Sequence, residues 1–324
     1  MDKPMNGMLF TFLAAHPTHG IGGDGMRGYR RLPRLFPSFL AMSWAILCAW
    51  LCLPESCGAT LGRWHHAERP SDSETHATAQ SVWTVGDRGE HIWVLHVVLA
   101  ELGYLPFTYH CVTPTDRLYA QDWSHAPLGA WTWNSPDLPP VLRRTWDPNQ
   151  FTEITKGAIM RFESDHGLRV DGYAGPRVRR MLQLAMALHL RTAQPYRLVM
   201  VDQTVPQRLC VWEDGRGVVF QTLCSTGLPS APTQPGLHVI FLRNREQTMQ
   251  GVGPSGRPYR VEHVPYVSFF YGEQAIHGFP RTVYGGPQSA GCVELPIAAA
   301  ERVWQLTGYG TLVFVSQHKA NGTG

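Results

Sequence analysis

Hydrophobic residues recur at helical spacing in three stretches between residues 82 and 190. The first stretch ends at Gly103, and its apolar positions are Ile92, Leu95, Val98, Leu99 and Leu102. The second stretch covers 152–166 and stops at Gly167, a residue that often ends a helix. The third begins at Pro176, and proline is favoured at the first helical position. The pattern predicts three short helices joined by turns.

After residue 196 the spacing changes to the two-residue alternation of strands. Apolar residues lie on both sides of Asp214-Gly215, a favoured turn pair; they are Val199, Val201, Leu209, Val211, Val218, Val219 and Phe220. A late helix is predicted from Pro296 to Gly308, followed by a strand over 311–316. We therefore predict a multidomain chain, with a small three-helix domain followed by a mostly β domain that has one late helix.

Residues 1–59 have the composition of an N-terminal signal region, whose signal proper we place at about 26–59. An apolar stretch over 36–53 precedes small residues at 57–59 and follows a basic segment with Arg27, Arg30, Arg31 and Arg34. This stretch is short for a membrane span, so we expect cleavage and export, with an uncleaved anchor through 36–53 as the alternative. Met26 is an alternative start to Met1. Residues 60–80 are polar and are predicted to form a linker.

The net charge of +3 is too small to indicate nucleic-acid binding, and no long basic run alternates with aromatic residues. Removal of the leader would leave four cysteines, namely Cys111, Cys210, Cys224 and Cys292. Cys210 and Cys224 flank the predicted hairpin, but their midpoint lies off the turn, so they would face each other only across a bulge. A disulfide between them is therefore less favoured than two buried thiols.

The segment 277–294, HGFPRTVYGGPQSAGCVE, carries the clearest chemistry of the chain. A cysteine is nucleophilic only as the thiolate, so a catalytic Cys292 needs a base such as His277. Glycines such as Gly285 and Gly291 permit tight turns that expose backbone N–H groups, which an oxyanion hole requires. Taken singly, a cysteine is more often a small buried hydrophobe, and a histidine more often a polar group with ordinary partners. Taken together, the pattern favours a nucleophile on a sharp turn.

The segment resembles the active-site motif of the L,D-transpeptidases, bacterial enzymes that cross-link peptidoglycan. The family pattern is His-Gly, a glycine-containing spacer and then Ser-His-Gly-Cys-(Val/Ile)-Arg, and here it begins at His277-Gly278 and continues from Ser289. Ala290 replaces the histidine of the family, and Glu294 replaces its arginine. The second change inverts a charge beside the nucleophile and would by itself raise the pKa of the thiol.

The resemblance assigns 196–318 to the catalytic domain and leaves 319–324 as a tail. It implies a mostly β-sandwich domain whose active cysteine lies in a groove under a flap. It also implies a nucleophile at Cys292, a general base at His277 oriented by the backbone carbonyl of Gly278, and oxyanion donors at the N–H groups of Gly291 and Cys292. The residues expected to contact substrate or shape its site are Tyr266, Arg281, Ser289, Ala290 and Glu294. Of these, Arg281 is the candidate cation that offsets Glu294.

Residues 81–192 resemble a bacterial peptidoglycan-binding domain, chiefly through the turn Val170-Asp171-Gly172-Tyr173-Ala174-Gly175-Pro176 before the third helix. This chain has a long insertion at 107–150 where the family has a short connection. The insertion holds Trp123, Trp131, Trp133 and Trp146. The aromatic residues are either a sugar-stacking surface or a flap that covers a small helical core, and the usual role of tryptophan favours the flap.

The resemblance implies a peptidoglycan L,D-transpeptidase that needs no cofactor or metal, acts as a monomer and forms 3→3 cross-links on stem peptides in the cell wall or periplasm. An L,D-carboxypeptidase acting on the same bond, or a wall-binding protein with an impaired active site, are the alternatives. A papain-like peptidase lacks its local signature here. A zinc site formed by His263, His277 and Cys292 fits no zinc spacing.

Overall fold

The computed structural model describes residues 81–112, 122–253 and 256–316. The chain divides into two units, Met1–His66 and Ala67–Gly324, and all described residues belong to the second. The predicted signal, linker and C-terminal tail lie outside the described residues. Within the described ranges, no helix is long and apolar enough to cross a membrane.

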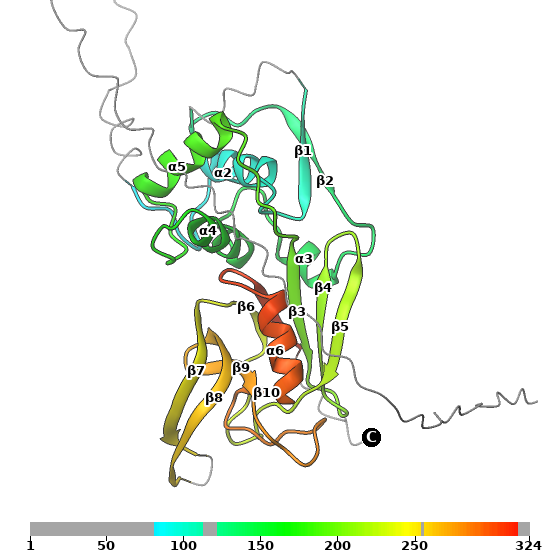
Figure 1. Cartoon of the computed structure of the whole chain (residues 1–324). Helices are drawn as coiled ribbons and strands as arrows, with labels where there is room; N and C mark the ends of the chain where they lie inside the picture. Colours follow the sequence, from blue (N-terminus) through cyan, green and yellow to red (C-terminus); the bar gives the residue numbers. More distant parts are fainter. Residues whose placement is uncertain (1–80, 113–121, 254–255, 317–324) are drawn as a thin grey trace, which may run out of the picture. The chain divides into compact units, whose positions relative to one another are not determined.

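The N-terminal part of the described chain is helical (Figure 1). Its helices are α2 (Glu90–Glu101), α3 (Pro140–Thr145), α4 (Glu153–Asp165) and α5 (Pro176–Ala187). The three predicted helices correspond to α2, α4 and α5, whereas α3 lies in the insertion and was not predicted. The Thr152 hydroxyl caps α4 by accepting from the N–H of Ile154, and Pro176 begins α5.

A buried histidine joins α2 to α4. Nδ1 of His96 lies 2.9 Å from the carbonyl oxygen of Pro148, and Nε2 lies 2.7 Å from Oγ1 of Thr155. A carbonyl can only accept, so Nδ1 carries the proton and Nε2 accepts from the Thr155 hydroxyl. Burial lowers the pKa of His96 to about 4, so the ring is neutral at physiological pH. This histidine is a structural part of the core.

The insertion at 107–150 contains a two-stranded antiparallel sheet of β1 (Phe107–Cys111) and β2 (Gly129–Trp133). Its aromatic rings pack on one another, with the Trp146 ring centroid 4.0 Å from that of Phe107 and 5.7 Å from that of Trp131. The tryptophans of the insertion also pack against the buried core of the helices. This packing favours the covering flap over a sugar-stacking surface.

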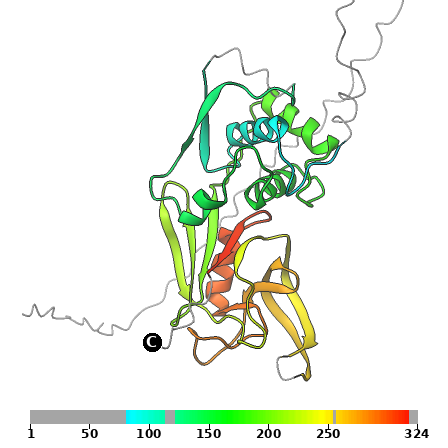
Figure 2. The ribbon, with the colours of Figure 1, turned by 180° about the vertical axis from the view of Figure 1, so that it is seen from behind.

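The described C-terminal residues, 196–253 and 256–316, form two sheets and the helix α6, which Figures 1 and 2 show from opposite sides. The five-stranded sheet has the order β5-β4-β3-β11-β6. Its strands are β3 (Arg197–Asp202), β4 (Arg208–Glu213), β5 (Gly217–Leu223), β6 (Gly236–Val239) and β11 (Leu312–Val315). Glu213 pairs with Gly217 across the predicted turn, and Cys210 pairs with Gln221. Cys210 and Cys224 are free thiols, as expected.

The second sheet has the order β10-β9-β8-β7. Its strands are β7 (Leu242–Val252), β8 (Pro258–Tyr271), β9 (Gln274–Gly278) and β10 (Val293–Leu295). The late helix α6 (Ile297–Leu306) follows Pro296, as the sequence predicts. One buried cluster joins both sheets and α6, and it includes Val199, Val211, Ile276, Val293 and Val303. The predicted fold, a helical domain followed by a mostly β-sandwich domain with one late helix, is therefore confirmed.

The central strands β3 and β11 of the five-stranded sheet are buried on both faces. Val199 and Val313 belong to the cluster shared with α6 and the second sheet. Leu198 and Leu312, their neighbours along the strands, belong to the cluster formed by the helical part. Because successive side chains of a strand point to opposite faces, this alternation shows that the helices cover one face and the second sheet covers the other.

The helical part and the sheet meet at two glycines, where the backbones approach closely. A Cβ on Gly157 of α4 would lie 2.6 Å from the carbonyl oxygen of Gly310 and 3.1 Å from Cδ2 of Leu312. A Cβ on Gly310 would collide with the carbonyl oxygen of Gly157. The contact therefore requires glycine on both sides.

We expect Gly157→Ala to lower the free energy of unfolding by up to about 2 kcal/mol. Crowding the Gly310 carbonyl costs ~1–3 kcal/mol, which outweighs the gain of about 1 kcal/mol from alanine in a helix. The measurement is chemical or thermal unfolding. Gly308→Ala is the matched control because a Cβ there meets nothing within 4 Å. A more stable Gly157→Ala variant would show that the close contact does not exist in solution.

Candidate active site

Parallel pairing of β9 with β10 builds the site. Val293 is in register with Ile276 and Glu294 with His277. Residues paired in register point to the same face of a sheet, and residues two apart on one strand share a face. The register therefore places Cys292, directly before β10, on the same face as Glu294 and His277.

His277 is only 2% exposed, and its Nδ1 lies 3.1 Å from the carbonyl oxygen of Gly278. The carbonyl can only accept, so Nδ1 carries the proton and Nε2 is left as the basic nitrogen. Burial lowers the pKa of His277; the Gly278 carbonyl and Glu294 raise it in part, while Arg281 lowers it. The ring is therefore neutral at physiological pH and can accept a proton. The placement of the Gly278 carbonyl agrees with the orienting role that the resemblance implies.

Cys292 is a half-buried free thiol that packs against Val264, Val267 and Ala275. Its Sγ lies 3.9 Å from the carbonyl oxygen of Glu273. Burial raises the pKa of the Cys292 thiol to about 11; Glu294 and Glu273 add to the rise, and a hydrogen bond with the Ala275 backbone opposes it. The thiol is therefore protonated at neutral pH and needs a base to become nucleophilic.

The β7–β8 hairpin lies over this thiol. Val264 and Val267, which pack with Cys292, belong to β8, and Met249 of β7 packs against the same cluster. Burial raises the pKa of Tyr259, near the start of β8, and the charges of Cys292 and Glu273 add to that rise. The sequence offered no signal for Tyr259, since its electrostatic coupling to Cys292 depends on the pairing of distant strands.

Hydrogen bonds hold the turn before Cys292. Ser289 is buried, and its Oγ donates to the carbonyl oxygen of Cys292 at 2.6 Å and accepts from the N–H of Gly291 at 3.1 Å. Thr233 is also buried, and its Oγ1 donates to the carbonyl oxygen of Gly291 at 2.8 Å and accepts from the N–H of Gly227 at 2.8 Å. Ser289 and Thr233 thus fix the backbone of Gly291 and Cys292.

This arrangement changes the expectation for the oxyanion hole. The N–H of Gly291 already donates to the Ser289 hydroxyl, so an oxyanion would compete with that hydroxyl for it. Gly291 has φ of 116°, and a Cβ there would lie 2.9 Å from Nε2 of Gln274. Glycine is required at 291 by this turn, independently of any role in catalysis. Gln274, whose Nε2 donates to the carbonyl oxygen of Pro232 at 3.0 Å, was not found from the sequence.

Arg281 and Glu294 form a partly buried ion pair. Nε and Nη2 of Arg281 lie 2.6 and 2.5 Å from Oε2 of Glu294, and Nη2 also donates to the carbonyl oxygen of Gln288. The Glu294 side chain is 8% exposed and that of Arg281 is 24% exposed. The cation that the sequence analysis placed opposite Glu294 is thus in contact with it.

The remaining predicted residues lie apart from this arrangement. Tyr266 packs with the cluster around α6, with its ring 6.4 Å from that of Trp304, and it is absent from the cluster that holds Cys292. Ala290 is exposed and has no structural role comparable to that of Ser289. Among the described residues, no group of three His, Cys, Asp or Glu side chains could hold a metal ion, so the zinc alternative has no support.

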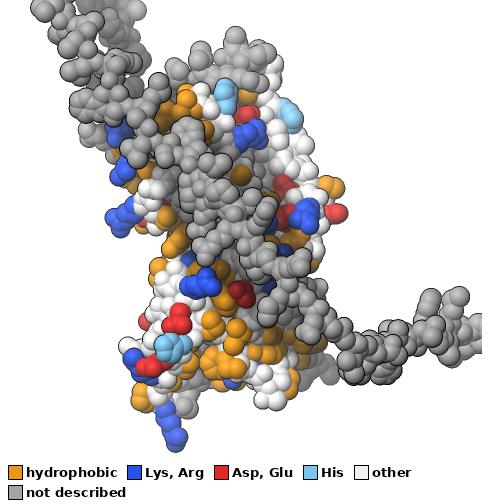
Figure 3. Space-filling model, viewed as in Figure 1, with side chains coloured by type: hydrophobic (Ala, Val, Ile, Leu, Met, Phe, Trp, Pro, Cys, Tyr) orange, Lys and Arg blue, Asp and Glu red, His pale blue; other side chains and the backbone are white. Residues whose placement is uncertain are grey.

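The surface of the catalytic part is partly apolar. Figure 3 shows hydrophobic side chains gathered over α6 and the loops beside it. Val283, in the loop between β9 and β10, and Ile297, at the start of α6, are exposed. The loop that carries Arg281 therefore also presents apolar surface next to the site.

Residues 196–315 match the family model of the L,D-transpeptidase catalytic domain, and residues 145–182 match that of the peptidoglycan binding domain. The chain carries an L,D-transpeptidase catalytic domain preceded by a peptidoglycan-binding domain. The second match covers α4 and most of α5 but not α2.

Solved structures similar to this chain include L,D-transpeptidases. The enzyme from Mycobacterium smegmatis is 22% identical with a TM-score of 0.34, and the match covers 38% of this chain and 59% of that one. The catalytic domain of the E. faecium L,D-transpeptidase is 24% identical with a TM-score of 0.34, and the match covers 38% of this chain and 99% of that one. No curated protein matches the chain. The domain assignment therefore rests on the two family models.

We expect Arg281→Ala to raise the pKa of Cys292 further and to slow its alkylation at neutral pH, because Glu294 would lose its counter-charge. The double variant Arg281→Ala with Glu294→Gln should recover part of this loss, since the two side chains are in contact. The measurement is the rate of thiol alkylation as a function of pH. Arg302→Ala is the control, because Arg302 is exposed and contacts only Gln305 at 3.4 Å. Purely additive effects would show that the pair does not influence the thiol.

Proposed function

We propose that the chain is a peptidoglycan L,D-transpeptidase that acts through a thioester on Cys292. The observation that carries the proposal is a neutral, buried His277 whose Nδ1 is held by the Gly278 carbonyl, on the strand paired with that of the thiol. The match of residues 196–315 to the catalytic-domain family model supports the same reaction class. No cofactor is required by this chemistry.

The first step is acylation. Nε2 of His277 accepts the thiol proton while Sγ of Cys292 attacks the carbonyl carbon of the third stem-peptide residue, forming a C–S bond. The imidazolium then gives its proton to the amine of the leaving D-alanine as the C–N bond breaks. The product is a thioester, and His277 is neutral again.

The second step transfers the acyl group to an amine. His277 accepts a proton from the attacking side-chain amine of a neighbouring stem peptide, a C–N bond forms and the C–S bond breaks. The proton returns to Sγ, and the product is a 3→3 cross-link. The N–H of Cys292 is our first candidate for the oxyanion donor, and the N–H of Gly291 could contribute only by leaving the Ser289 hydroxyl.

Two related functions remain as alternatives. Water in place of the amine would make the protein an L,D-carboxypeptidase, but the apolar residues of the β7–β8 hairpin around Cys292 favour a dry site. A wall-binding protein with an impaired site would follow if Glu294 disabled the thiol, but Arg281 offsets that charge. We further propose that the protein is exported and acts in the cell wall or periplasm as a monomer.

We expect Cys292→Ala to abolish both adduct formation with a carbapenem and release of D-alanine from a disaccharide-tetrapeptide. His277→Ala should reduce both rates by about a hundredfold or more, as expected for loss of a general base. Intact-protein mass spectrometry measures the adduct. Cys210→Ala is the control, because Cys210 is a half-buried thiol on β4, outside the cluster that holds Cys292. Full activity of Cys292→Ala would contradict the proposal.

The pH dependence of acylation tests the protonation states. The pKa of His277 is lowered, so the base is neutral above its usual pKa of 6.5 and the rate should fall only as the pH decreases below that value. The pKa of Cys292 is about 11, so the rate should be level between about pH 7 and about pH 9, where the pair remains thiol and imidazole. Single-turnover acylation at several pH values gives the profile. A bell-shaped profile centred on acidic pH would indicate a preformed thiolate–imidazolium pair instead.

A further inference from the structure

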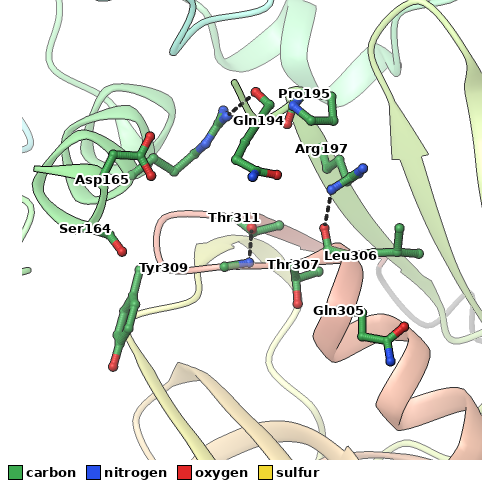
Figure 4. A pocket seen from close by; sticks show the side chains of 12 residues that line it. Ser164, Asp165, Gln194, Pro195, Arg197, Gln305, Leu306, Thr307, Tyr309 and Thr311 are labelled. Atoms are coloured by element: carbon green, nitrogen blue, oxygen red, sulfur yellow. Dashed lines mark hydrogen bonds between the residues drawn. The ribbon is translucent and has the colours of Figure 1, made fainter. Parts of the chain in front are cut away.

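A cavity of about 260 Å³ lies between α4 and the end of α6, and Cys292 is not among the residues that line it. One wall comes from Arg161, Ser164 and Asp165 of α4, which lie in the segment that matches the peptidoglycan binding domain. The opposite wall comes from the end of α6 and the turn before β11, and the connection 194–197 closes the cavity (Figure 4). Both walls belong to the same compact unit of the chain.

The two guanidinium groups at the cavity are already engaged. Nη2 of Arg161 donates to the carbonyl oxygens of Gln194 and Pro195, at 3.1 and 3.4 Å. Arg197 forms an ion pair with Glu213 at 2.7 Å and donates to the carbonyl oxygen of Leu306 at 3.0 Å. Both cations therefore hold the protein together, and a carboxylate ligand would have to compete with these contacts.

The groups that are left for a ligand are mostly neutral. Within the described residues, no hydrogen bond involves the side chain of Ser164 or the side-chain amide of Gln194, and both residues are exposed. Oδ2 of Asp165 accepts from the hydroxyls of Tyr104 and Thr192, at 2.9 Å each, which leaves Oδ1 as an acceptor. Figure 4 shows the Gln194 side chain reaching toward the middle of the cavity, with Tyr309 to one side below Ser164.

We propose that this cavity is a binding site for an N-acetylated sugar unit of a glycan strand. Amide, hydroxyl and carboxylate oxygen groups next to an aromatic ring match the alternating hydroxyl, acetamido and C–H surfaces of such a sugar. The volume suits one sugar unit rather than a long ligand. The choice of an amino sugar rests on the proposed function in the cell wall, whereas the neutral polar lining is independent of it.

Such a site would bind the glycan at the junction of the two domains. A strand held there would contact α4 of one domain and the turn at Tyr309 of the other. The stem peptides carried by that strand would then be tethered to the protein that acts on them. Tethering raises the effective concentration of the second binding partner without any new contact at the thiol.

The test is calorimetric titration of the whole protein with a β-1,4-linked tetramer of N-acetylglucosamine. Gln194→Ala and Ser164→Ala should each weaken binding about threefold to tenfold, the usual effect of losing one hydrogen bond. The Gln194 backbone contacts with Thr192 and Arg161 persist in the alanine variant. Gln221→Ala is the matched control, since Gln221 is an exposed glutamine on β5 away from the cavity. Its affinity should equal that of the unmodified protein.

Two results would overturn the site: no binding of the tetramer by the unmodified protein, or equal binding by the Gln194→Ala variant and the unmodified protein. Binding of a free stem tetrapeptide that depends on Gln194 would instead identify a peptide site and would also refute the proposal. D-Alanine release from a soluble tetrapeptide, which has no glycan, should be unchanged in Gln194→Ala. If the unmodified protein released no D-alanine, the proposed acyl transfer would be refuted. The titration with the tetramer would still decide whether the glycan site exists.

Discussion

The burial of both faces of β3 and β11 is the constraint on which the rest of the structure depends. Alternate residues of these parallel strands pack into two different cores, Leu198 and Leu312 toward the helices and Val199 and Val313 toward α6. A sheet buried on both faces needs a layer on each side. The helical domain therefore completes the core of the catalytic domain, and the glycine contact between α4 and the turn before β11 allows the two layers to approach closely.

The same burial determines the electrostatics of the site. Desolvation is the largest cause both of the raised pKa of Cys292 and of the lowered pKa of His277, so the resting pair is neutral. In the proposed reaction, a neutral pair makes proton transfer part of the attack itself and removes the need for a stable thiolate. The Arg281–Glu294 ion pair offsets one of the two carboxylates, Glu294 and Glu273, that raise the pKa of the thiol. Burial is thus the main reason why both Cys292 and His277 are uncharged at neutral pH.

The sequence predicted the features that depend on local patterns. The glycine at 167, the proline at 176 and the turn at Asp214-Gly215 all gave correct element boundaries, because each acts on neighbouring residues. The pairing of Arg281 with Glu294 was also inferred, since an uncompensated buried charge is costly. The sequence could not predict that Thr233 supports the Gly291 carbonyl, or that Tyr266 packs beside α6, because these contacts depend on the pairing of distant strands.

The two departures from the family motif have different structural costs, and their positions explain why. Ala290 is exposed on the turn, so its side chain can change without leaving any buried group unpaired. Glu294 is 6% exposed and lies in register with His277, so a carboxylate there must have a partner. Arg281, from the loop between the paired strands, supplies that partner. The family motif has an arginine two residues after its cysteine, where this chain has Glu294 on β10. Here a guanidinium next to the site comes instead from Arg281, in the loop between β9 and β10. The charge on β10 is therefore reversed, but a guanidinium is kept beside it.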